Sequence, residues 1–177
     1  MKRIVHIGSF TCLLWAAYSA HAQAVPTAER SRAVQIGATW SVANPDYAPH
    51  KIQGISIYGT YDLLHNWGIE GAVHRVSAIT PAQIGEDSYL LGPRYVFRFG
   101  RYTPYGKALF GLGRFKYTIP NTAYSYKIYA FGGGVDVHAS EHFKIRAIDV
   151  EYQEWPSYQP HGLTPMMVSF GAAYAFR

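Results

Sequence analysis

The sequence predicts an all-β protein, an eight-stranded antiparallel up-and-down transmembrane β-barrel. In the stretch 165–176, apolar or aromatic residues alternate with small ones at a period of two, which is typical of a strand with two different faces. Similar alternation recurs in seven earlier segments of roughly ten to thirteen residues, long enough to cross a bilayer at the usual strand tilt. The connections between these segments alternate between long and short, as in barrels that have both termini in the periplasm.

The N-terminus has the features of a secretory signal peptide. Lys2 and Arg3 precede a mostly apolar run, 4–20, that ends at the small-x-small site Ala20-His21-Ala22. We therefore expect a signal peptide at 1–22 and an outer-membrane β-barrel domain at 23–177. The single cysteine, Cys12, lies in the leader, so the mature chain is expected to have neither a disulfide nor a Cys metal site.

The first four strands are expected at 32–43, 51–63, 67–76 and 88–99. In the first, Val34, Ile36, Ala38, Trp40 and Val42 share the face predicted to contact lipid, and the residues between them are small or polar. Turn residues at 44–46 and 64–66 separate the first three strands, and 77–87 is expected to be a longer polar loop.

The last four strands are expected at 103–115, 125–137, 143–155 and 165–176. Short turns are predicted at 100–101 and 138–142, and longer loops at 116–124 and 154–164. In the seventh strand, strict alternation points Ala147, Asp149, Glu151 and Gln153 into the lumen.

The last two strands resemble those of the OmpA-like transmembrane barrel family. The similarity lies in Val150-Glu151-Tyr152-Gln153 before Trp155, and in the run 169–176. The aromatic residues Phe170, Tyr174 and Phe176 resemble the closing-strand signature of that family, although Arg177 follows where Phe usually stands last. Glu154, inserted before Trp155, is a second departure. The resemblance implies the generic outer membrane protein β-barrel group, without a peptidoglycan-binding domain.

In that family, acidic and basic side chains pair inside the barrel, which implies a similar role for Glu70, Arg94, Lys107 and Glu151. The alternation independently points these four residues inward. Eight strands leave little room for water, and unpaired buried charges are costly, so we expect ion pairs across the lumen. Such pairs either hold the lumen shut or line a narrow, gated pore.

Other motifs carry less weight. His138 and Ser140 resemble the catalytic pair of a lipid A deacylase, but they fall at a predicted periplasmic turn, where polar caps are the simpler interpretation. His138 and His142 have a metal-ligand spacing only on a helix. The glycines at 111–113 and 132–134 lack the helix and the Lys-Ser/Thr of a phosphate loop.

The composition also limits the partners of this chain. It has 16 basic and 11 acidic residues, Lys2 and Arg3 among the former, which gives no clear nucleic-acid signal. We predict a monomer of the cell outer membrane that contacts outer-membrane lipids and, during insertion, the barrel assembly machinery. No catalytic residue, cofactor or metal is expected. The predicted role is structural or in surface interactions, with a narrow ion channel or a lipid-modifying enzyme as the alternatives.

Overall fold

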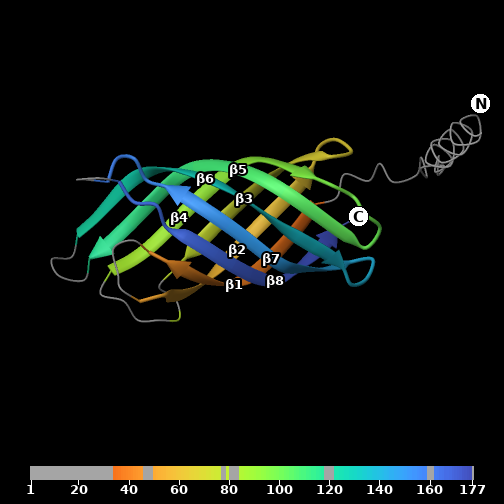
Figure 1. Cartoon of the computed structure of the whole chain (residues 1–177), viewed down its shortest axis with the longest axis horizontal. Helices are drawn as coiled ribbons and strands as arrows, with labels where there is room; N and C mark the ends of the chain where they lie inside the picture. Colours follow the sequence, from red (N-terminus) through yellow and green to blue (C-terminus); the bar gives the residue numbers. More distant parts are fainter. Residues whose placement is uncertain are drawn as a thin grey trace, which may run out of the picture. The chain divides into compact units, whose positions relative to one another are not determined.

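The chain forms a closed antiparallel barrel of eight strands, drawn in Figure 1. The computed structural model describes residues 34–45, 50–76, 79, 84–117, 122–158 and 162–176. The predicted signal peptide, 1–22, lies outside these residues. The strands are β1 (Val34–Asn44), β2 (Ile52–Asp62), β3 (Trp67–Arg75), β4 (Ile84–Val96), β5 (Tyr102–Tyr117), β6 (Thr122–His138), β7 (Phe143–Glu154) and β8 (Met166–Phe176).

Each strand pairs with its neighbours in sequence, and β1 closes the barrel by pairing with β8 from Val34↔Phe176 to Asn44↔Met166. Val34 and Phe176 therefore lie at the same end of the barrel as the connections 63–66, 97–101 and 139–142; we call it the turn end. The strand ends that flank 45–51, 76–83, 118–121 and 155–165 lie at the other end, the loop end. The predicted fold class is confirmed.

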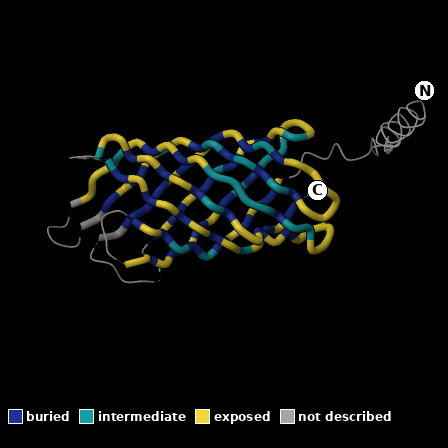
Figure 2. The backbone as a smooth tube through the Cα atoms, in the orientation of Figure 1, coloured by how far each residue is buried: buried dark blue, intermediate teal, exposed yellow. Residues whose placement is uncertain are grey.

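Buried and exposed residues alternate along most of each strand, as Figure 2 shows, with exceptions at the start of β4 and at residues 147–148 of β7. The outward face is apolar: Ile57 is 58% exposed and Phe131 is 54% exposed. A soluble protein rarely exposes apolar side chains over such an area, whereas lipid would cover them. In the described part of the chain, no helix is long and apolar enough to cross a membrane.

Aromatic side chains form a belt near the turn end. The Trp67 and Tyr95 rings meet edge-on with centroids 4.9 Å apart, and Tyr95 meets Phe97 in the same way. The Tyr174 ring on β8 lies 5.4 Å from that of Phe143 on β7 and 4.9 Å from that of Phe176 on its own strand. Such a girdle is expected where a membrane barrel crosses the interface between lipid and water.

Four strand ends differ clearly from the prediction. β4 begins at Ile84 rather than at 88 and ends at Val96, while β5 and β6 extend to Tyr117 and Thr122. The polar residues at these ends suggested loops, but the β4–β5–β6 ladder continues through them. Only residues 118–121 therefore separate β5 from β6 in the sequence, fewer than the predicted loop 116–124.

The predicted orientation of Ala147 is wrong. A β-bulge interrupts the pairing of β7 with β6 and β8, so that Val135 pairs with Ile148 but Asp136 pairs with Arg146. Ala147 is the extra residue, and both it and Ile148 are exposed. The bulge shifts the alternation by one position and turns Arg146 into the lumen.

Candidate functional site

A network of charged side chains crosses the lumen of the barrel. The four residues singled out in the sequence all point inward, and Glu70, Arg94, Lys107 and Glu151 are 0%, 2%, 6% and 2% exposed. They come from β3, β4, β5 and β7. The structure adds Asp136 on β6 and Arg146 on β7 to the network, together with Asp149 on β7, which the alternation had already pointed inward.

Glu70 lies at the centre of this network and contacts three cations. Its Oε1 accepts a hydrogen bond from Lys107 Nζ at 3.2 Å, and its Oε2 lies 3.6 Å from Arg94 Nε. The third cation, Arg146, donates from Nη2 to Oε2 at 2.9 Å and from Nη1 to Oε1 at 3.2 Å. This two-pronged contact is the strong form of an arginine–carboxylate pair.

The Arg146 guanidinium also joins the acids of β6 and β7. Its Nε donates to Asp136 Oδ1 at 3.2 Å and its Nη1 to Asp149 Oδ2 at 3.3 Å. Its planar group lies 3.5 Å from the centre of the Tyr58 ring on β2. Stacking on an aromatic face is favourable for a guanidinium that has left water. One side chain therefore links β7 to β2, β3 and β6.

The remaining pairs complete the network. Arg94 Nη2 donates to Asp136 Oδ2 at 2.5 Å, and Lys107 Nζ donates to Asp149 Oδ2 at 2.7 Å. Lys107 Nζ is also 2.8 Å from Glu151 Oε2. Three permanent cations therefore face four carboxylates, and every one of these carboxylates has a cation within salt-bridge distance.

A histidine missed in the sequence adjoins the fourth carboxylate. His74 Nε2 lies 3.5 Å from Glu151 Oε1, and its Nδ1 is 2.6 Å from Ser56 Oγ. The alternation of β3 already pointed His74 inward. Its position on the same inward face as Glu70, four residues away, could have identified it from the sequence.

Towards the loop end, the inward residues of β7 and the residue that follows it change from charged to polar to aromatic: Glu151, Gln153 and Trp155. Gln153 Nε2 donates to Glu151 Oε1 at 2.8 Å, and Trp155 Nε1 donates to Gln153 Oε1 at 3.0 Å. Trp155 is fully buried. Its ring fills the space beside Gly113, where a Cβ atom would overlap it.

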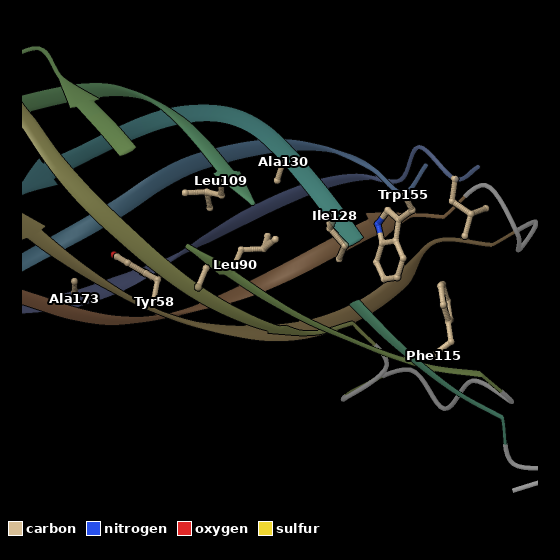
Figure 3. Close-up of a cluster of buried hydrophobic side chains, with 10 residues drawn as sticks. Tyr58, Leu90, Leu109, Phe115, Ile128, Ala130, Trp155 and Ala173 are labelled. Atoms are coloured by element: carbon tan, nitrogen blue, oxygen red, sulfur yellow. The ribbon is translucent and has the colours of Figure 1, made fainter. Parts of the chain in front are cut away.

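An aromatic cluster surrounds Trp155 and closes the lumen. Its ring centroid lies 4.9 Å from that of Phe115, which in turn lies 5.4 Å from Tyr158. Figure 3 shows Trp155, Phe115 and Ile128 together near the loop end, with Leu109 and Tyr58 deeper in the barrel. We call Phe115, Tyr126, Trp155 and Tyr158 the aromatic plug.

His138 and Ser140, which the sequence suggested as a possible catalytic pair, are not arranged as one. Ser140 Oγ accepts a hydrogen bond from the backbone N–H of Phe143 at 3.1 Å, as a turn cap does. His138 lies at the end of β6, with its Nδ1 3.4 Å from the Arg101 carbonyl oxygen. Within the described ranges, no group of three or more metal-binding side chains comes together.

The closed barrel, its apolar outer wall and its packed lumen define a small integral membrane barrel. The sequence matches the model of the outer membrane protein beta-barrel domain over residues 10–176, and the chain belongs to that family. It is therefore a protein of the outer membrane. No curated protein matches the sequence.

Several solved structures share the fold. Neisserial surface protein A is 16% identical, with a TM-score of 0.62 and coverage of 81% of this chain and 96% of that one. OprG of Pseudomonas aeruginosa is 15% identical, with a TM-score of 0.57 and coverage of 83% and 97%. The N-terminal β-barrel domain of OprF from the same species is 15% identical, with a TM-score of 0.55 and coverage of 82% and 98%. At these identities the similarity shows the fold alone.

Proposed function

We propose that this protein is a sealed, non-conducting barrel with a structural role in the outer membrane, and that its loop end takes part in surface interactions. The observation that carries the proposal is the filled lumen. Charged residues occupy it between β3 and β7, and the aromatic plug occupies it nearer the loop end. An ion would have to displace both.

The two layers oppose conduction for different reasons. Every carboxylate of the network already has a cation partner, so a passing ion would have to break buried pairs. The aromatic plug offers no charge to replace the hydration shell of an ion. A narrow channel, the alternative from the sequence, requires both layers to rearrange together.

The orientation supports a role at the cell surface. In outer-membrane barrels the short turns face the periplasm, which places the loop end outside. We propose that the chain is secreted with residues 1–22 as its signal peptide, is inserted by the barrel assembly machinery and remains a monomer. Surface partners would then meet the loop end.

A lipid-modifying activity has no support in the geometry. The Ser140 hydroxyl caps a turn at the proposed periplasmic end by accepting the backbone N–H of Phe143, while His138 Nδ1 lies 3.4 Å from the Arg101 carbonyl oxygen. Replacing Ser140 by Ala should therefore leave the lipid A of expressing cells unchanged in its mass spectrum. The disappearance of a deacylated species in the variant would show that the barrel is an enzyme.

The structural role can be tested in cells that lack the protein. We expect the deletion to increase leakage of a periplasmic marker and sensitivity to detergents, and we expect the wild type and Ser140→Ala to restore both equally. Unchanged leakage in the deletion strain would contradict an envelope role. If the wild type restores integrity but Ser140→Ala does not, the defect belongs to an activity of that serine.

A further inference from the structure

A row of charged residues crosses the outer wall of the barrel close to the loop end. The strand pairing aligns Arg75 on β3 with Asp87 on β4, and Asp87 with Arg114 on β5. Arg75 Nε donates to Asp87 Oδ1 at 3.0 Å while its side chain stays 60% exposed. Arg114 is exposed as well. Two guanidinium groups thus flank one carboxylate and leave a net positive charge.

Lys127 on β6 adds to this charge. It pairs with Leu112, next to Arg114 on the same outward face, and it is exposed. Glu154 on β7 pairs with Tyr129, two positions from Lys127 along β6. Because Glu154 can offset the charge of Lys127, the net positive charge of the row comes mainly from Arg75 and Arg114.

Directly below the row, the lipid-facing wall has an apolar depression of about 470 Å³. Its lining includes Val73, Tyr89 and Leu112, which are the next outward residues after the three members of the row. Two residues along a strand span about 7 Å. The distance from the charges to the depression therefore corresponds to that between a lipid headgroup and the start of its acyl chains.

The depression exists because Gly71 has no side chain on this face. Its cross-strand partner Leu91, together with Phe110, projects outward beside it. A Cβ atom at Gly71 would lie 3.5 Å from Leu91 Cδ1, which is an ordinary contact. The barrel itself therefore does not require glycine at this position, and a larger side chain there would fill the depression without disturbing the wall.

We infer that the arginine row and the depression form a binding site for a phosphorylated lipid of the outer leaflet, lipid A. Its phosphate would lie over the buried Asp87 and contact the exposed N–H groups of Arg75 and Arg114 that do not bind Asp87, and one acyl chain would occupy the depression at Gly71. The phosphate adds a negative charge where the row carries a positive one.

The position of the site, on the lipid-facing wall near the loop end, favours lipid A over other occupants. A second copy of the chain, packed by a twofold axis, would bring the arginines of both copies together, which is unfavourable. A water-soluble partner could reach the row but not the depression, which opens into the bilayer. Phospholipids share the phosphate chemistry, but the row lies at the loop end, which faces the outer leaflet.

The inference can be tested by native mass spectrometry of the folded protein, titrated with lipid A, with dephosphorylated lipid A or with phosphatidylglycerol. The wild type should retain lipid A about tenfold better than either other lipid. The double variant Arg75→Gln/Arg114→Gln should lose this preference, and Gly71→Leu should weaken retention of lipid A several-fold. Arg101→Gln, which removes an exposed arginine at the turn end, is the matched control and should behave as the wild type.

Heat-modified gel migration shows whether each variant is folded. If the folded double variant keeps lipid A as the wild type does, the site is not where we place it. If phosphatidylglycerol or dephosphorylated lipid A is retained equally well, the selectivity for lipid A is wrong. If Gly71→Leu has no effect while the double variant loses binding, the acyl-chain part of the inference is wrong.

Discussion

Replacing Arg146 by Met tests the network at its most connected residue. The substitution keeps a long, flexible side chain but removes the hydrogen bonds to Glu70, Asp136 and Asp149 and the stacking on Tyr58. Four buried carboxylates would then face only Arg94 and Lys107. Removing one partner from a buried set of charges costs about 3–5 kcal/mol, because the charges left behind stay out of water.

That cost corresponds to a change of roughly a hundredfold to several thousandfold in the unfolding equilibrium. It can be measured by urea unfolding in lipid vesicles, with tryptophan fluorescence and gel migration as readouts. The double variant Arg146→Met/Glu70→Gln should recover part of the loss, since it also removes the central carboxylate.

Arg98→Met is the matched control for this measurement. Arg98 pairs with Asp62 at 3.1 Å, but its side chain is 34% exposed at the turn end. An exposed ion pair contributes about 1 kcal/mol or less, so the control should unfold almost as the wild type does. Equal midpoints for Arg146→Met and Arg98→Met would refute the reasoning, because the lumen would then have to be hydrated.

Three further changes test other parts of the structure. Arg94→Ala should lower the free energy of unfolding by about 3–5 kcal/mol, since Asp136 loses one of its two cations; an unchanged value would contradict the pairing. Trp155→Ala should cost about 3–5 kcal/mol through the cavity that it leaves in the aromatic plug, measured by the same urea titration. Ala147→Cys, carrying a fluorescent label, should be quenched by brominated lipids, with a label at the inward Ala173 of β8 as the unquenched control; an unquenched label at Ala147 would show that the β7 bulge is not at this residue.

Most of the fold could be predicted because lipid imposes a strict pattern on the sequence. A residue facing lipid must be apolar and its neighbour must fit the lumen, so the period of two fixes the orientation along whole strands. The closing strand shows this best: every residue from Met166 to Phe176 faces the side that the alternation predicts, except that Gly171 is only partly buried. At residues 84–87 and 122–124 the alternation imposed by lipid is absent. The sequence therefore suggested loops there, but the strands continue through both segments.

The candidate site was only partly predictable, for a local reason. Alternation pointed Glu70, Arg94, Lys107 and Glu151 inward, but it placed Ala147 where Arg146 lies. The sequence does hold a signal for the bulge: Ile145 and Ile148, both lipid-facing, are three positions apart instead of two. The aromatic plug depends on which strands meet across the loop end, and the spacing along one strand contains no such information.

The most direct test of a sealed lumen is the current through a planar bilayer that contains the folded protein. We predict that the wild type leaves the current at its baseline under an applied voltage, because the charge network and the aromatic plug fill the lumen. Discrete, reproducible conductance steps from the wild type, which change in size in Arg94→Ala, would contradict this account and identify a gated pore.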